Sequence, residues 1–216
     1  MKPNRGLFIT FEGGEGAGKS TLIRRIYSDL EARGIPVVKT YEPGGTSLGH
    51  NLRQLLLEKE DIHIARRAEL FLFLADRAQH VEEILLPSLR ENKVVLCDRF
   101  TDSTLAYQGV PRANDQEEIR NLCTFATEDL LPDLTFLLDI DPQIGLKRTK
   151  KIAKVFDRME QEKLSFHIKV REAFLKLAEE DQERFYTIDA TMSPDEVFNL
   201  AIHEVNTKLN QFSCCE

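Results

Sequence analysis

A glycine-rich segment near the start of the chain constrains the fold more than any other sequence feature. It has the spacing Gly-x-x-x-x-Gly-Lys-Ser from Gly13 to Ser20, and it lies between an apolar run, residues 7–11, and a helical pattern. Glycines let the backbone approach an anion closely, and the amide groups of the loop and of the helix start then face it. The segment therefore predicts a phosphate-binding P-loop, in which Lys19 reaches the β- and γ-phosphates of a nucleotide and the Ser20 hydroxyl binds Mg²⁺.

The rest of the chain alternates between β-rich runs and longer helical patterns. Strands are predicted at residues 7–11, 37–41, 94–97, 134–139 and 185–188. Helices are predicted from the glycine loop to Arg33-Gly34, over 65–86, over 164–180 and after a capping box at 193–196. This alternation predicts an α/β fold with a five-stranded parallel sheet flanked by helices. A length of 216 residues fits one domain spanning the whole chain, 1–216.

Composition excludes several classes of function. Lys and Arg number 29 and Asp and Glu 36, so the net charge is −7, which argues against nucleic acid as a partner. No apolar stretch approaches the roughly 18 residues of a membrane span, and no signal-type segment precedes the first strand, so we expect a cytoplasmic protein without a membrane partner. The four cysteines, Cys97, Cys123, Cys214 and Cys215, lack metal or redox spacing and are expected to be reduced.

Two acidic positions bear on the chemistry of the loop. Glu15 lies within it, and like-charge repulsion should turn this carboxylate away from a triphosphate, either into solvent or toward the hydroxyl of a second substrate. Asp98 ends an apolar strand, at the edge where parallel sheets bind ligands, and can hold Mg²⁺ directly or through water. Arg99 follows it as a candidate phosphate ligand, although a structural ion pair explains Asp98-Arg99 equally well.

A basic run stands out in this acidic chain. Residues 147–154 carry five positive charges, at Lys147, Arg148, Lys150, Lys151 and Lys154. Composition alone favours a solvated helix end for such a run.

The motifs, taken together, resemble the thymidylate kinase family. Residues 96–108 match its D-R-[FY]-x-x-S-x-x-A-[FY] segment. The loop at 11–21, Glu42-Pro43-Gly44-Gly45-Thr46 with Leu52-Arg53, and Phe73-Leu74-Ala75-Asp76-Arg77 follow the order of the family, and the resemblance continues through 157–160 to Asp189-Ala190. It implies Mg²⁺-dependent transfer of the γ-phosphoryl group from ATP to dTMP, giving dTDP, in a homodimer.

The resemblance also implies roles for individual residues. Phe73 would stack on thymine, Arg77 would donate to its O4 and Thr104 would contact N3. Arg53 and Arg99 would bind the dTMP phosphate, Glu15 would accept from the 3′-hydroxyl, and Tyr107 would crowd the 2′ position. Ser103 and Gln108 complete the implied dTMP site. The implied ATP site consists of Gly13, Gly14, Glu15, Gly16, Ala17, Gly18, Lys19, Ser20, Thr21 and Arg148.

The family supplies a catalytic cation either from the P-loop or from a lid, and Gly16 in the loop here is similar to the second type. The basic run is then part of a lid at about 147–160 with Lys150, Lys151, Lys154, Asp157 and Arg158, and Lys19, Arg99 and Arg148 are the candidate catalytic residues. The chain departs from many relatives at Tyr41, where they have Arg, and in a lid richer in Lys.

Two other functions stay open at this point. Another nucleoside monophosphate or deoxynucleoside kinase would share the fold and differ in the residues that contact the base. A P-loop regulatory ATPase would bind a partner instead of a phosphoryl acceptor, which leaves Arg53, Arg77 and Arg99 unexplained. GTPases are disfavoured because Asn92-Lys93-Val94-Val95 lacks the Asp of a guanine-binding loop.

Overall fold

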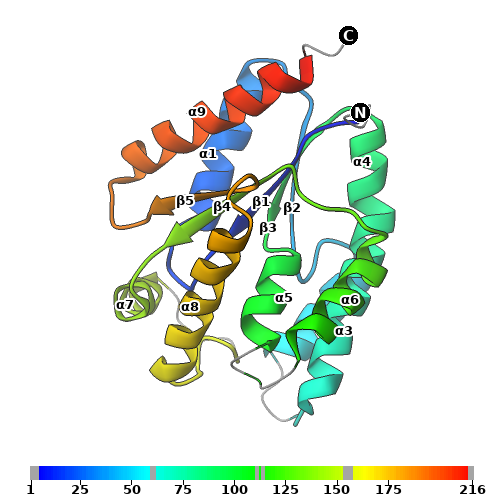
Figure 1. Ribbon diagram of the computed structural model, residues 1–216, viewed down its shortest axis with the longest axis vertical. Coiled ribbons are helices and arrows are strands. Elements are labelled where there is room, and N and C mark those ends of the chain that lie inside the picture. Colours follow the sequence, from blue (N-terminus) through cyan, green and yellow to red (C-terminus); the bar gives the residue numbers. More distant parts are fainter. Residues whose placement is uncertain (1–4, 59–61, 110–111, 113–114, 153–157, 214–216) are drawn as a thin grey trace.

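The chain folds into three layers, with helices on both faces of one central sheet (Figure 1). The computed structural model describes residues 5–58, 62–109, 112, 115–152 and 158–213. Of the helices in those ranges, none is both long and apolar enough to cross a bilayer.

The sheet is parallel throughout, as predicted. It contains β1 (Phe8–Glu12), β2 (Val37–Tyr41), β3 (Val94–Asp98), β4 (Leu134–Asp139) and β5 (Phe185–Asp189), in the order β2-β3-β1-β4-β5. β1 is therefore central, and Phe11 pairs in register with Asp98 of β3. Because both strands end at the same edge, the glycine loop that follows β1 and the Asp98-Arg99 pair lie beside each other.

Helices connect the strands. They are α1 (Lys19–Ala32), α2 (Ser47–Arg53), α3 (Arg66–His80), α4 (Leu86–Arg90), α5 (Thr101–Gln108), α6 (Gln116–Thr127), α7 (Pro142–Ile152), α8 (Leu164–Glu180) and α9 (Pro194–Ser213), with two π-helical turns, η1 (Gln54–Glu58) and η2 (Val81–Leu85). The predicted helix over 65–86 is realised as α3 continued by η2 and α4. The capping box is present, since Ser193 N donates to Glu196 Oε2 (2.9 Å) and Glu196 N donates to Ser193 Oγ (3.3 Å).

Several helices have no counterpart among the predicted elements, and two of them, α2 and α6, begin with a capping side chain. In α2 the Thr46 hydroxyl accepts from Gly49 N (2.9 Å), and in α6 the Asp115 carboxylate accepts from Glu117 N and Glu118 N. These caps satisfy backbone donors that a helix start otherwise leaves without partners.

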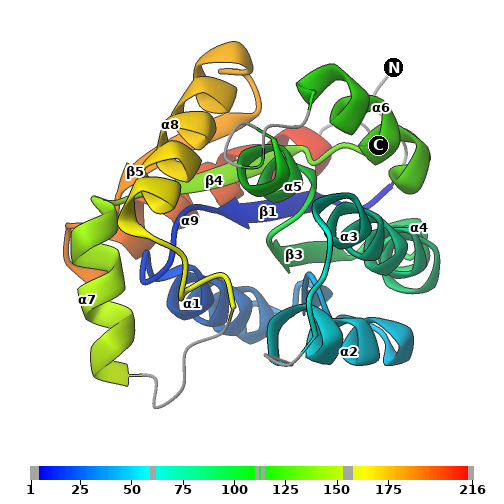
Figure 2. The ribbon, with the colours of Figure 1, turned by 90° about the horizontal axis from the view of Figure 1, so that it is seen from below.

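Each face of the sheet has its own core. α1 and α9 cover one face, where Ile26 and Leu30 of α1 and Ala201 and Val205 of α9 are fully buried. α3, α5, α6 and α8 cover the other face around Phe174. Figure 2 shows α3, α5 and α8 on one side of β1 and β3 and α1 on the other. Both faces of the sheet are thus covered, so ligands have access at the carboxyl ends of the strands.

Candidate active site

The glycine loop wraps around the amine of its own lysine. Lys19, the first residue of α1, is buried, and its Nζ donates to the carbonyl oxygens of Gly13 (3.0 Å) and Gly14 (3.1 Å). Burial is the main cause that lowers the pKa of Lys19, followed by the charge of Arg99. The turn into the helix is made by Gly18 at φ 97°, a left-handed conformation that favours glycine.

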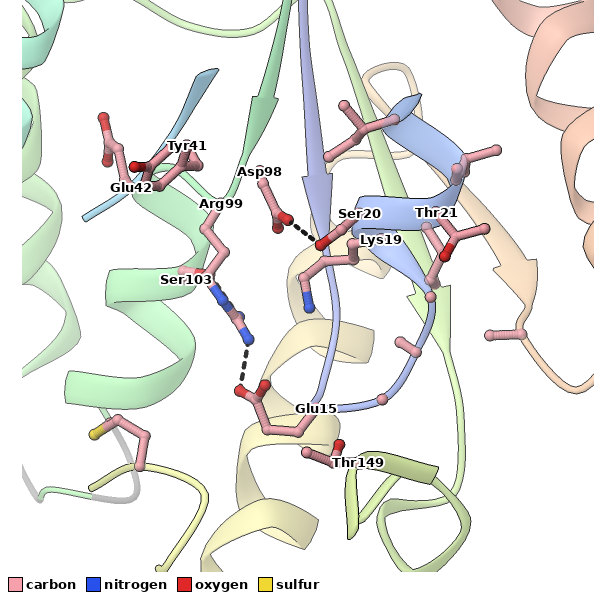
Figure 3. Close-up of a pocket in the computed structure, with 18 of the residues that line it drawn as sticks. Glu15, Lys19, Ser20, Thr21, Tyr41, Glu42, Asp98, Arg99, Ser103 and Thr149 are labelled. Atoms are coloured by element: carbon pink, nitrogen blue, oxygen red, sulfur yellow. Dashed lines mark hydrogen bonds and ion pairs between the residues drawn. The ribbon is translucent and has the colours of Figure 1, made fainter. Parts of the chain in front are cut away.

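An oxygen pair at the start of α1 fits a divalent cation. Ser20 Oγ donates to Asp98 Oδ2 at 3.0 Å (Figure 3). The second carboxylate oxygen, Asp98 Oδ1, is buried and has no hydrogen-bond partner among the described residues. A buried carboxylate oxygen normally has a partner. Hard oxygen donors next to a phosphate loop are the ligands that Mg²⁺ takes, so the residues present fit this ion.

Arg99 binds Glu15 across the mouth of the loop. Its Nη2 donates to Glu15 Oε1 at 2.6 Å, and the Tyr107 hydroxyl donates to the same oxygen at 2.9 Å (Figure 3 shows the Arg99 contact). Arg99 Nη1 donates to Gly13 O and to Ser103 Oγ, both at 3.2 Å. Arg99 therefore pairs with Glu15 rather than with Asp98, and Glu15 faces the same cavity as Arg99 and Tyr107 instead of solvent.

The charges around Glu15 keep it ionised. Burial raises the pKa of Glu15, but the charges of Arg99 and Lys19 and the Tyr107 hydrogen bond outweigh this and hold the pKa at about 2. The carboxylate is thus a fixed hydrogen-bond acceptor at neutral pH.

Arg77 and Thr104, which are both predicted to contact the base, are hydrogen-bonded to each other. Arg77 Nη1 donates to Thr104 Oγ1 (2.8 Å), its Nη2 donates to Phe100 O (2.9 Å), and its Nε donates to Glu42 Oε2 (2.8 Å). Arg77 is 2% exposed, so this ion pair with Glu42 is buried.

The residues predicted to bind dTMP share a single cavity of about 1320 Å³ with most of the glycine loop. Of the predicted site residues, those that line it are Glu15, Gly16, Ala17, Gly18, Lys19, Ser20, Thr21, Arg53, Phe73, Arg77, Asp98, Arg99, Ser103, Thr104, Tyr107, Gln108 and Arg148. Gly13 and Gly14 do not line it, although their carbonyl oxygens bind Lys19. Arg53 Nη1 donates to Pro43 O (2.9 Å) and its guanidinium lies over the Tyr41 ring, 5.6 Å from the centroid.

The predicted lid residues divide into three groups, which are those that line the cavity, those that do not and those that lie outside the described part of the chain. Arg148 of α7 lines the cavity and its Nη1 donates to Ala190 O (2.8 Å), which ties α7 to the loop after β5. Lys150 is exposed and does not line the cavity. Arg158 also does not line it, because its Nη2 donates to Glu69 Oε2 of α3 at 2.6 Å. Lys154 and Asp157 lie outside the described residues, as does the side chain of Lys151.

Glu12 is a buried residue that the motifs did not single out. It ends β1 and accepts hydrogen bonds from Phe100 N (2.8 Å) and Ser103 Oγ (2.6 Å), which fixes the start of α5 directly after Arg99. Burial and the charge of Asp102 raise the pKa of Glu12 to about 8. The sequence did contain a signal for Glu12, because it is an acidic residue at the end of an otherwise apolar strand. A carboxylate in that position is rarely buried without a polar partner.

Comparison with known proteins assigns the chain to a family. The family model described as thymidylate kinase matches residues 11–201. A thymidylate kinase from Protochlamydia amoebophila is 49% identical over 205 residues, 92% of this chain and 91% of the relative, and one from Desulfovibrio desulfuricans is 52% identical over 197 residues, 88% and 91%. The crystal structure of a thymidylate kinase from Ehrlichia chaffeensis superposes with a TM-score of 0.73 at 33% identity, covering 93% of this chain and 98% of that one. Because the family model matches residues 11–201 and these relatives are about half identical over most of the chain, the chain belongs to the thymidylate kinase family.

Proposed function

We propose that this chain is a thymidylate kinase that transfers the γ-phosphoryl group of ATP to the 5′-phosphate of dTMP, giving ADP and dTDP. The observation that carries the proposal is the single cavity, in which the P-loop and the acceptor-side residues Arg53, Arg77 and Arg99 face one another. A P-loop ATPase without a phosphoryl acceptor has no use for three arginines opposite its nucleotide. The whole chain, 1–216, is proposed to act as one domain.

On the donor side, the amide groups of the loop and Lys19 would bind the triphosphate. Support comes from the position of the Lys19 amine, whose hydrogen-bond acceptors among the described residues are the carbonyl oxygens of Gly13 and Gly14, and a phosphate could replace them. Ser20 and Asp98 would hold Mg²⁺, which when bound neutralises charge on the phosphates. Arg148 would cover the nucleotide, which is consistent with its contact to Ala190 O at the cavity edge.

On the acceptor side, Phe73 would stack on thymine, with Arg77 and Thr104 at its polar edge and Ser103 and Gln108 nearby. Arg53 and Arg99 would bind the dTMP phosphate, Glu15 would accept from the 3′-hydroxyl and Tyr107 would exclude a 2′-hydroxyl. The dTMP phosphate is already ionised, so the reaction needs alignment and charge neutralisation rather than a general base. Water must be excluded as well, because it competes as acceptor.

The lid at about 147–160 is proposed to supply the cation that meets the transferring phosphoryl group, since Gly16 leaves the loop without one. We also propose a cytoplasmic homodimer. Phe71 of α3 and Phe125 of α6 are 56% and 86% exposed on helices that pack together, and a second copy would cover these two apolar side chains. Introducing a charge by Phe125→Asp should then lower the mass measured by light scattering.

The proposed activity is tested by a coupled assay of ADP release with ATP, Mg²⁺ and each of dTMP, dUMP, dCMP, dAMP, dGMP and ribose TMP. Turnover should depend on dTMP, and Lys19→Ala and Arg99→Ala should each lower kcat/KM by two or more orders of magnitude, because each removes a charge aimed at a phosphate in a water-poor site. Preference for another nucleotide would point to a different nucleoside monophosphate kinase. ATP hydrolysis indifferent to every acceptor would indicate a regulatory ATPase.

A further inference from the structure

The predicted base-reading residue Arg77 is held by a chain of buried groups that begins at the sheet. Its guanidinium shares Glu42 Oε2 between Nε and Nη2, both at 2.8 Å. Its guanidinium also donates to Thr104 Oγ1, to the Phe100 carbonyl oxygen and, at 3.9 Å, to Cys123 Sγ. Arg77 lines the cavity, so the direction in which it presents its Nη1 group there depends on where the Glu42 carboxylate sits.

Glu42 is itself fixed by a histidine. Its second oxygen, Oε1, lies 2.8 Å from His80 Nδ1, and His80 Nε2 lies 2.6 Å from Thr40 Oγ1 of β2. His80 is 0% exposed and does not line the cavity. An imidazole nitrogen facing a carboxylate carries its proton, so in the neutral ring Nε2 accepts from the Thr40 hydroxyl.

The imidazole lies against the loop that follows β2. A Cβ at Gly45 would lie 2.8 Å from both Cδ2 and Nε2 of the ring, so the loop after β2 packs directly on it. One turn earlier on α3, Asp76 Oδ1 accepts from Gly44 N at 3.0 Å, which holds the same loop against the helix. Thr40, His80, Glu42 and Arg77 thus form one rigid hydrogen-bonded chain from the sheet to the cavity.

We propose that His80 is a positioning residue for the acceptor site: through Glu42 it sets the orientation of Arg77 and thereby the preference for a base with a carbonyl oxygen over a base with an amino group at the same ring position. The inference rests on the proposed function and adds a specificity determinant outside the cavity. A fixed donor rejects an amino group because two donors then face each other, whereas a donor that can swing away rejects it less.

Two substitutions of His80 separate its two hydrogen bonds. An asparagine amide reaches about as far as imidazole Nδ1, so H80N keeps a donor for Glu42 and loses the Thr40 contact. A glutamine amide reaches about as far as Nε2, so H80Q keeps the Thr40 contact and loses Glu42. T40V removes the outer hydrogen bond without touching the ring. The measurements are kcat and KM for dTMP, dUMP and dCMP, KM for ATP, and the melting temperature.

We expect H80Q to lower kcat/KM for dTMP about tenfold, mainly through KM, and to narrow the dTMP to dCMP ratio by about tenfold, with KM for ATP unchanged. H80N should have a dTMP to dCMP ratio close to that of the wild type. T40V should narrow this ratio as H80Q does, but by less. In an Arg77→Gln background H80Q should change the ratio no further, because His80 acts through Arg77.

Equal losses in H80N and H80Q, or a lower melting temperature with the base ratio unchanged, would show that His80 is only a core residue and overturn the proposal. If H80Q does not fold, the ratio in T40V and H80N decides between these outcomes. A wild-type enzyme that does not phosphorylate dTMP contradicts the proposed function instead, so the two failures are distinguishable.

Discussion

Gly16 of the phosphate loop packs directly against the backbone of Gly145 in α7. A Cβ on Gly16 would overlap the carbonyl oxygen of Gly145, and a Cβ on Gly145 would overlap the carbonyl oxygen of Glu15. The loop therefore has no space for a side chain at this point, which gives a physical reason why an arginine cannot be supplied from position 16. The same helix, α7, carries Arg148.

This contact predicts that Gly16→Ala lowers the free energy of unfolding by more than its backbone strain alone would. Gly16 has φ 68° and Gly34 has φ 72°, but a Cβ at Gly34 meets nothing within 4 Å. Gly34→Ala should then lower the free energy of unfolding by about 1 kcal/mol, whereas Gly16→Ala should lose clearly more and also raise KM for ATP. Urea unfolding measures the free energies of unfolding of both variants, and ATP titration measures their ATP binding. If the two variants lost equal stability, α7 would have moved to make space for the added methyl group.

Tyr107 is predicted to set the choice of sugar. Its ring packs against Phe166 and Phe174, with centroids 6.1 Å away in both cases, and its hydroxyl binds Glu15. Tyr107→Ala should raise the efficiency with ribose TMP relative to dTMP about tenfold. The same change should lower the free energy of unfolding by about 3 kcal/mol because it opens a cavity.

Tyr107→Phe is the matched control, since it removes the hydroxyl and keeps the ring. It should lower kcat, because Glu15 loses a partner, and leave the ribose to deoxyribose ratio as in the wild type. A ratio that stays unchanged in Tyr107→Ala would mean that the ring is only part of the core.

The Glu15 carboxylate predicts a specific loss of stability in acid. Its pKa in the folded chain is about 2, below the ordinary value of 4.5, so the stabilisation is fully present above pH 4.5 and is lost as the pH falls toward 2. Above pH 5, Glu15→Gln should therefore reduce the free energy of unfolding by an amount on the order of 2 kcal/mol, and this difference should shrink steadily below pH 4.5. Urea unfolding between pH 3 and 7 measures it.

Arg99→Gln serves as the control for this pH dependence, because it removes the charge nearest to Glu15. The acid-dependent part of the effect of Glu15→Gln should be smaller when Arg99 is absent. A difference that is flat with pH would show that the carboxylate gains nothing from its partners.

The sheet and the phosphate loop were predictable because local sequence specifies them. The alternation of apolar runs and helical patterns predicts where the strands lie. The spacing from Gly13 to Ser20 is typical of phosphate-binding loops and of few other structures. The predicted strands end within one residue of the observed ones, as for β1 at Phe8–Glu12. The short helix α2 was not predictable in this way, because its stability comes from the Thr46 cap and from packing on α3.

The partners of the site residues depend on tertiary contacts between distant segments. Sequence alone left Asp98-Arg99 open as a structural ion pair, whereas the left-handed backbone of Arg99, φ 68°, turns its side chain to Glu15, 84 positions earlier. Similarly, Arg158 belongs by sequence to the lid, yet it binds the buried Glu69, which also accepts from Gln108 Nε2 at 3.1 Å. Neither pairing has a signal in spacing or composition.

Arg148 is held at the edge of the cavity by its hydrogen bond to Ala190 O. If the lid supplies the cation for the transferring phosphoryl group, removing this charge must act on the transition state more than on the bound substrates. Arg148→Ala should therefore lower the single-turnover rate of phosphoryl transfer at least tenfold and change the Kd of dTMP by less than about twofold, with weaker ATP binding as well. Arg148→Lys keeps the charge but not the planar guanidinium group, so it should recover part of the rate.

Lys150→Ala is the matched control on the same helix, because Lys150 is exposed and does not line the cavity. This variant should transfer the phosphoryl group at close to the wild-type rate. Lys151→Ala and Lys154→Ala, measured in the same rapid-quench experiment, identify any second cation. Wild-type transfer rates in all four alanine variants would mean that the basic run is a solvated surface and that the charge is neutralised from elsewhere in the site.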